Sequence, residues 1–234
     1  MNYEFSFEEI TARIKRLKNY KAVGAALIPN EVLKQRCIIN VLLNFTNICF
    51  LNKIMPSVWQ KALISPIPKS SLKDPHVPLN YRGISLISCV YKLYSSLINE
   101  RLKCHLEHND LLVDEQNGFR PNRSCIEHVH TLTTVVRNRM SHNLPTFTAF
   151  IDMRKAFDWV DRDLLLFKIM SQFDIKGTMY NAIKSLYINL QCSVKLNNFN
   201  TQWFPISSGV KQGGTLSPTF FKMFLNDVQL KLKS

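Results

Sequence analysis

The strongest candidate for chemistry is Asp152, in the segment AFIDMRKAFDWV. The preceding residues 146–151 (TFTAFI) are rich in β-formers and predict a buried strand that would end at this carboxylate. A strand fixes a carboxylate in place, and a backbone carbonyl beside it can add a second oxygen ligand, which suits Mg²⁺. Asp158 follows six residues later. Alternatively, Asp152 caps a helix that follows it, and the local pattern favours neither interpretation.

A glycine-rich junction is the second candidate, in the segment SSGVKQGGTLSPTFF. Gly213 and Gly214 precede a predicted helix that either Thr215 or Ser217 could cap. Glycines before a helix allow backbone N–H groups to approach a phosphate, sugar or base closely, and Gln212 adds a donor and an acceptor beside them. Taken alone, the segment fits an ordinary loop-to-helix junction better than a binding site.

Two pairs of basic residues complete the candidates. Lys69 lies in SPIPKSS and Arg82 in NYRGISL, and such residues clamp triphosphates in phosphoryl-transfer sites. Arg120 and Arg123 lie in NGFRPNRS, a basic turn with an aromatic residue that suits a nucleic-acid backbone or a stacked base. Each of these residues alone is weak evidence for a binding site, because most Lys and Arg residues are solvated surface charges.

Hydrophobic periodicity and capping signals predict the elements that must position these residues. Helices are predicted over about 6–19 (with Ser6 and Glu9 as a capping box), from Pro29 onward, and over 84–107, 123–140, 161–172, 178–189 and 216–233. Strands are predicted at 62–68 (an edge strand, because of its prolines), 146–151, 192–196 and 202–207, the last two around Asn197-Asn198. The irregular mixture predicts an α+β fold.

Charge points to a polyanionic partner. The 234 residues carry 30 Lys and Arg against 17 Asp and Glu, a net charge of +13. Nucleic acid is the first candidate partner and an anionic membrane surface the second. No membrane span is predicted, since the longest apolar stretch (37–54) carries an asparagine stripe at helical spacing.

Cysteine usage and the N-terminus predict an intracellular protein. The six cysteines are scattered without a CxxC pair, so neither a disulfide framework nor a disulfide-linked partner is expected. The N-terminus, MNYEFSFEEI, lacks the features of a signal peptide, which predicts a nuclear or cytoplasmic rather than secreted protein. Structural zinc at the Cys and His residues of 104–108 and 125–130 is disfavoured, because their spacings match no common finger.

Taken in order, the motifs resemble the reverse transcriptases of non-LTR (LINE-type, Jockey- and CR1-like) retrotransposons. KAVGAALIPNEVLK, PIPK, NYRGISLIS, QNGFRPNRS, AFIDMRKAFDWV and GVKQGGTLSPTFFKMFLND follow the order of that family's blocks, from about residue 5 to residue 234. The resemblance implies a right-hand polymerase fold, with a helix-rich N-terminal extension (1–60), fingers (61–145) and a partial palm (146–234). It also implies an RNA template, a DNA primer, dNTPs and Mg²⁺.

Residue roles follow from the same resemblance. Asp152 matches the first catalytic, metal-binding aspartate, and Ile151 or Met153 would lend its backbone near the metal. Phe157 matches the bulky gate that favours dNTPs, and Lys69 with Arg82 matches the fingers residues that hold the triphosphate.

The same resemblance assigns the remaining candidates to nucleotide and nucleic-acid contacts. Gln212 and Gly213 match the loop that lines the nucleotide pocket. Arg120, Arg123 and Gly214 are the expected nucleic-acid contacts.

One departure from the family pattern affects catalysis. The aromatic-Ala-Asp-Asp hairpin of the palm is absent from this sequence. The resemblance therefore predicts an enzyme fragment, truncated before that motif and inactive by itself, because a two-metal site needs carboxylates on both sides of the ions. The alternatives are a non-catalytic nucleic-acid-binding remnant and a fragment of a group II intron maturase-like reverse transcriptase.

Overall fold

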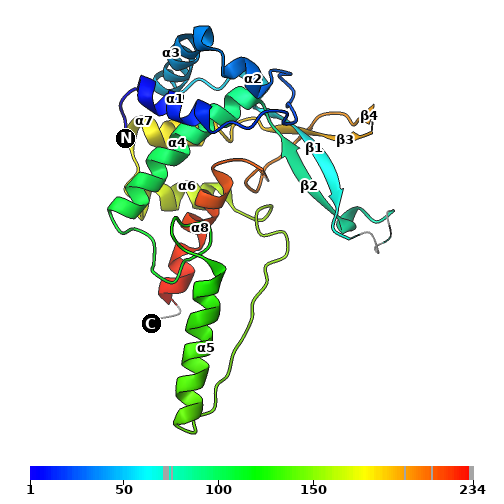
Figure 1. Ribbon diagram of the computed structural model, residues 1–234. Helices are drawn as coiled ribbons and strands as arrows, with labels where there is room; N and C mark the ends of the chain where they lie inside the picture. Colours follow the sequence, from blue (N-terminus) through cyan, green and yellow to red (C-terminus); the bar gives the residue numbers. More distant parts are fainter. Residues whose placement is uncertain (71–73, 75, 198, 212, 232–234) are drawn as a thin grey trace.

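The computed structural model describes residues 1–70, 74, 76–197, 199–211 and 213–231, and it combines helices with one sheet (Figure 1). The predicted α+β class is therefore confirmed. The α-helices are α1 (Phe7–Lys15), α2 (Asn30–Leu33), α3 (Arg36–Asn52), α4 (Cys89–His108), α5 (Cys125–Ser141), α6 (Arg162–Ser171), α7 (Gly177–Ser185) and α8 (Ser217–Lys231). The 3₁₀ helices are η1 (Ser57–Trp59) and η2 (Pro78–Asn80). The strands are β1 (Lys61–Pro68), β2 (Tyr81–Leu86), β3 (Gln191–Leu196), β4 (Phe199–Asn200) and β5 (Phe204–Pro205).

The sheet joins two distant parts of the chain. Its order is β2-β1-β3-β4, and β5 also pairs with β3. β1 and β2 form an antiparallel ribbon, whereas β1 and β3 are parallel. The predicted pair of strands around Asn197-Asn198 is confirmed, since β4 and β5 both run antiparallel to β3; Asn198 itself lies outside the described residues.

The prediction that 62–68 is an edge strand is only half right. Leu63 and Ile64 lie between β2 and β3, whereas Lys61 and Ala62 pair with β3 alone in the part of the chain that the structure describes. Among the described residues, the second half pairs only with β2, and Pro66 and Pro68 fall there. Proline lacks an N–H group and therefore tolerates a position where one side of the strand has no partner.

The N-terminal segment packs on α4 through a buried arginine of that helix, Arg101. Arg101 donates from Nη1 to the carbonyl of Tyr3 (2.6 Å), from Nη2 to the carbonyl of Glu4 (2.7 Å) and from Nε to the Glu9 carboxylate (2.8 Å). Its guanidinium also lies over the rings of Tyr3 and Phe5, 4.3 and 4.4 Å from their centroids. Glu9 completes the predicted capping box with Ser6, so α1 begins where expected.

The predicted helix over 84–107 is wrong at its start. Residues 84–86 belong to β2, which pairs with β1, and α4 begins at Cys89. Strand pairing with a distant segment is a tertiary interaction that local periodicity does not reveal.

The predicted strand at 146–151 is also wrong. This segment has no regular secondary structure, and Phe147, Phe150 and Ile151 are 93%, 85% and 84% exposed. A strand needs a neighbouring strand for its backbone hydrogen bonds, and no described segment lies beside this one in the sheet. Asp152 is therefore carried by an extended segment instead of a buried strand.

Helix α5 stands apart from the rest of the chain. It projects from the helical body, and the segment that follows it returns alongside (Figure 1). None of its side chains is buried, and Ile126, Val129 and Met140 are exposed.

All six cysteines are free thiols. Among the residues that the structure describes, no helix combines the length and the apolarity needed to cross a membrane.

Candidate functional site

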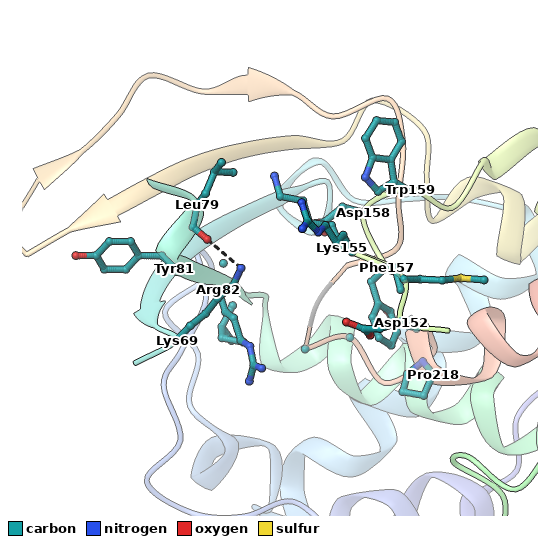
Figure 2. Close-up of a pocket in the computed structure, with 18 of the residues that line it drawn as sticks. Lys69, Leu79, Tyr81, Arg82, Asp152, Lys155, Phe157, Asp158, Trp159 and Pro218 are labelled. Carbon is teal, nitrogen blue, oxygen red and sulfur yellow. Dashed lines mark hydrogen bonds between the residues drawn. The ribbon is translucent and has the colours of Figure 1, made fainter. Parts of the chain in front are cut away.

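A cavity of about 1140 Å³ opens between the β1–β2 ribbon, the segment after Asp152 and the start of α8 (Figure 2). Its lining includes most of the residues singled out from the sequence, namely Lys69, Arg82, Asp152, Met153, Phe157, Gly213 and Gly214. The structure thus brings together four segments that are far apart in the chain.

The basic side of the cavity is built by the β1–β2 ribbon. Pro68 pairs with Tyr81, so Lys69 and Arg82 stand at the same end of two adjacent strands. The Lys69 ammonium donates to the Leu79 carbonyl (2.9 Å), and the Lys69 N–H donates to the Asn80 carbonyl (2.9 Å). Arg82 has an exposed side chain that lines the cavity. Two cations therefore face the opening.

The acidic side is formed by Asp152 and Asp158. The Asp152 carboxylate is exposed and faces the opening, across from Lys69 and Arg82 (Figure 2). No helix follows it, so it does not act as a helix cap; residues 154–159 form turns instead. Within them the Asp158 N–H donates to the Lys155 carbonyl (2.8 Å), and both residues line the cavity. The sequence prediction gave Lys155 no role, although it lies in the same motif.

Phe157 is held firmly at the base of this turn. Its ring stacks on Phe221 of α8, with centroids 5.0 Å apart and an interplanar angle of 27°. Its carbonyl accepts a hydrogen bond from Val210 N–H (2.8 Å). A Cβ on Gly209 would lie 2.9 Å from that carbonyl oxygen, so only glycine fits beside the turn. The position of Phe157 is therefore fixed from two sides.

Arg162, which the sequence prediction missed, connects the turn to the chain before α8. Its guanidinium donates to the carbonyls of Ile206 (2.7 Å), Ser208 (2.8 Å) and Gly209 (2.8 Å) and lies 5.1 Å from the ring centroid of Tyr187. Burial lowers the pKa of Arg162, although guanidinium remains charged at neutral pH. A run of backbone carbonyls that converge on one arginine has no local sequence signature.

The glycine junction packs against the ribbon. Gly213 has a φ of +92°, and a Cβ there would lie 3.4 Å from the Ser85 carbonyl oxygen of β2. Ser217 Oγ donates to the Lys211 carbonyl (2.6 Å), and Thr215 Oγ1 lies 2.7 Å from Ser95 Oγ of α4. The predicted helix start is confirmed, because α8 begins at Ser217. Gln212 lies outside the described residues.

Lys211 sits behind this junction, outside the main cavity. Its ammonium donates to the Trp59 carbonyl (3.2 Å) and lies 4.4 Å from the Tyr91 ring centroid. Burial lowers its pKa to about 8. We infer that it supports the junction structurally.

Three predicted site residues do not join the cavity. Arg120 is tied to Glu107 by an ion pair (2.7 Å) and donates to the Val113 carbonyl (3.1 Å), while Arg123 is paired with Asp114. Ile151 is exposed to solvent and does not line the cavity.

Phe119, next to Arg120, does line the cavity. Its carbonyl accepts a hydrogen bond from Lys222 (3.1 Å), a buried residue of α8.

The donors available for a metal ion are limited. Among the described residues, no group of three or more His, Cys, Asp or Glu side chains is placed to hold one. Asp152 and Asp158 are the carboxylates that line the cavity. Mg²⁺ commonly binds one or two carboxylates plus substrate phosphates, so this donor set suits Mg²⁺ that arrives with a nucleotide.

Sequence comparison finds relatives of this chain among known proteins. The family model for reverse transcriptase (RNA-dependent DNA polymerase) matches residues 67–234. The chain is 32% identical over 224 residues to "Probable RNA-directed DNA polymerase from transposon BS" of Drosophila melanogaster, covering 94% of this chain and 24% of that protein. It is 28% identical over 228 residues to "RNA-directed DNA polymerase from mobile element jockey" of Drosophila melanogaster, covering 95% of this chain and 24% of that protein.

A more distant relative extends the pattern. The chain is 25% identical over 228 residues to "Retrovirus-related Pol polyprotein from type-1 retrotransposable element R2" of Popillia japonica, covering 97% of this chain and 30% of that protein. The chain thus spans about a quarter of the length of the first two of these relatives. The family match covers most of the chain and the relatives are polymerases of mobile elements, so this chain belongs to the reverse transcriptase family, in its non-LTR, Jockey-like branch.

Proposed function

We propose that this chain is the nucleotide-binding part of an RNA-directed DNA polymerase that extends a DNA primer on an RNA template. The proposal rests on one observation. A single cavity is lined by Lys69 and Arg82, by the Asp152 carboxylate and by the Gly213–Gly214 junction. Within this proposal, residues 61–145 act as fingers, 146–234 as part of the palm, and 1–60 as a helical extension that supports them.

The arrangement suits phosphoryl transfer, in which catalysis depends on positioning and on charge neutralisation. Lys69 and Arg82 would bind the triphosphate of the incoming dNTP from the ribbon side. Asp152 would hold Mg²⁺, with the backbone carbonyl of Ile151 or Met153 as a further oxygen ligand. When bound, Mg²⁺ supplies neutralisation of the phosphate charge.

Phe157 would select the sugar. Its ring is fixed by Phe221 and by the hydrogen bond that its carbonyl accepts, so it cannot move aside easily for a larger substrate. A fixed ring below the sugar would clash with a ribose 2′-hydroxyl and favour dNTPs. Gln212 and Gly213 would contact the nucleotide, and Gly214 would contact the template–primer.

We expect little primer extension from these 234 residues by themselves. Asp152 and Asp158 come from one short stretch of the chain, so the carboxylates that line the cavity lie on one side of it. Asp227, the only acidic residue after Asp174, is paired with the buried Lys168 (2.6 Å). A two-metal site needs carboxylates on both sides of the ions, so metal affinity should be weak.

A second candidate is nucleic-acid binding without catalysis. The net charge of +13 favours it, since counterion release by basic residues drives such binding. The internal pairing of Arg120 and Arg123 weakens the part of this hypothesis that rested on them. A maturase-like origin has less support, because the relatives described above are proteins of transposons and retrotransposable elements.

The test is the binding of a fluorescent dATP analogue with and without Mg²⁺. We expect Mg²⁺-dependent binding that Asp152→Asn and Arg82→Gln each weaken by about tenfold, which is the effect of losing roughly one charged contact. Asp163→Asn is the matched control, since this exposed carboxylate of α6 does not line the cavity. Nucleotide binding unchanged in both site variants would overturn the proposal. Primer extension that depends on Asp152 would overturn only the expectation of inactivity.

A further inference from the structure

The sheet has an unusual charge distribution. Its five strands contain Lys61, Arg82 and Lys195 and no acidic residue. The whole stretch between Asp174 and Asp227 also lacks Asp and Glu. Arg82 belongs to the cavity, but Lys61 and Lys195 lie elsewhere in the sheet and do not line it. The β3–β4 end of the sheet extends away from the helical body, where no helix covers it in this view (Figure 1).

Strand register places the two lysines on the same face. Lys61 pairs with Gln191 across the parallel β1–β3 ladder, so their side chains point to the same side. Lys195 lies four residues after Gln191 in β3 and therefore shares that side, because side chains alternate along a strand. Gln191 and Lys195 are exposed.

A partly exposed indole lies beside Lys61. Trp203, just before β5, is 40% exposed, and the Lys61 ammonium lies 5.2 Å from its ring centroid. The segment that carries it is fixed to β3, because Ser193 Oγ donates to the Thr201 carbonyl (2.7 Å) and Val194 N–H donates to Thr201 Oγ1 (2.9 Å). We name the surface made by Lys61, Gln191, Lys195 and Trp203 the β3 face.

We propose that the β3 face binds the single-stranded part of the RNA template, outside the nucleotide cavity. A flat aromatic ring beside a lysine, on a sheet whose strands carry no acidic residue, has the composition of a single-strand site: bases stack on the ring and phosphates contact the cations. A duplex would offer its phosphates but not its base faces, so the indole would contribute nothing to duplex binding. This proposal rests on the proposed polymerase function, in which unpaired template RNA must lie ahead of the site of synthesis.

The first test is the affinity for a labelled, unstructured oligouridylate, measured by fluorescence anisotropy over a range of salt concentrations. We expect Trp203→Ala to weaken binding by about tenfold, the loss typical of one stacked base, and Trp203→Phe to retain most of the affinity. Lys195→Gln should lower the slope of log affinity against log salt by about 0.7, the value for one phosphate contact on a single strand.

Matched controls separate this face from general charge effects. Tyr20→Ala removes an aromatic residue that is 96% exposed on the helical side, and Lys184→Gln removes an exposed lysine of α7. Both control variants should bind RNA like the wild type. Equal losses in the controls and in the β3-face variants would overturn the proposal, as would normal binding by Trp203→Ala and Lys195→Gln.

A second measurement does not depend on the folding of any variant. Photocrosslinking of the wild-type chain to 4-thiouridine RNA should label the tryptic peptide 196–211, which contains Trp203. Labelling confined to other peptides would contradict the proposal. The same oligonucleotide made as DNA should bind no more tightly than RNA, and preferential DNA binding would overturn the assignment to the template.

The outcomes distinguish this inference from the proposed function. Trp203→Ala should leave the Mg²⁺-dependent binding of the dATP analogue unchanged, because the β3 face does not line the cavity. If the cavity variants lose nucleotide binding while the β3-face variants bind RNA normally, only the present inference fails. If the β3-face variants lose RNA binding while the cavity variants bind nucleotide normally, the proposed polymerase site fails and the single-strand site stands.

Discussion

Gly24 lies so close to Ile87 that a Cβ on Gly24 would be 2.4 Å from the carbonyl carbon of Ile87 and 2.6 Å from the backbone nitrogen of Ser88. The loop of the N-terminal extension therefore rests directly on the junction between β2 and α4. Arg82 and Ser85, which face the cavity and the glycine junction, belong to that same β2 strand. The extension and the cavity are thus linked through one backbone contact.

We predict that Gly24→Ala lowers the free energy of unfolding by about 2 kcal/mol, because the methyl group must push backbone atoms apart. Urea denaturation followed by circular dichroism measures this change. Gly118→Ala is the control, since the nearest atom to its Cβ would be the flexible end of Gln116, 3.3 Å away. An equal loss of stability in both variants would contradict the steric explanation.

Gly213→Ala should weaken nucleotide binding more than its effect on stability explains. The φ of +92° is strained for alanine, so the junction should shift relative to Ser85 and the cavity should change shape. Gly177→Ala serves as the comparison, because Gly177 also has a positive φ (+66°) but lies at the start of α7, away from the cavity. Both variants should be less stable, and only Gly213→Ala should lose affinity for the dATP analogue.

Arg101→Met should destabilise the packing of the N-terminal helices on α4. The substitution keeps a similar volume but leaves the Glu9 carboxylate and the carbonyls of Tyr3 and Glu4 without their donor. Loss of one partner of a buried pair costs about 3 kcal/mol, and partial exposure of Glu9 should reduce the cost here. Glu9→Gln, which keeps an oxygen acceptor, should cost less when measured by the same urea titration.

Local signals predicted the helical part of the fold well. The Ser6–Glu9 capping box forms, α8 starts at Ser217, and the turn around Asn197 joins paired strands. The errors concern segments whose structure depends on a distant partner. The sequence predicts helix for residues 84–86 of β2, because the pairing of that strand with β1 is not visible in its own periodicity. It predicts a buried strand at 146–151, because β propensity says nothing about whether a neighbouring strand exists.

Lys222 predicts a pH dependence of stability. Burial lowers its pKa to about 8, against about 10.5 in the unfolded chain. The unfolded state therefore binds more protons between these values, so this lysine should make the protein more stable as pH rises from about 8 to about 10.5. Lys222→Met should remove this pH-dependent contribution to the free energy of unfolding. The difference in free energy of unfolding, variant minus wild type, should therefore be largest below pH 8. It should fall as the pH rises above 8, because only the wild type gains stability there.

The measurement is urea denaturation of both proteins at pH 7 and at pH 10. Comparing the two proteins cancels the opposing contribution of groups such as Cys192, whose pKa is raised by burial. A difference between the two proteins that stays constant with pH would contradict the assignment to Lys222.

The sequence predicts which motifs form the candidate site, but it does not predict which partners their side chains contact. Lys69, Arg82, Asp152 and Gly213 were identified by residue type and by their order along the chain, and the structure places them around one cavity. The predicted ligand contact of Arg120 is not seen at the cavity, because a basic turn looks the same in sequence whether its guanidinium faces a ligand or a nearby Glu107. Arg162 was missed because its partners are main-chain carbonyls, which every residue has.

The isolation of α5 has a consequence for how the chain unfolds. Packing of an apolar face supplies most of the stability of a helix in a protein, and α5 buries no side chain. Its amide protons should therefore exchange with solvent deuterium far faster than those of α4, most of whose side chains are buried. Melting of α5 should precede the main transition, and a single two-state curve should not describe the whole chain.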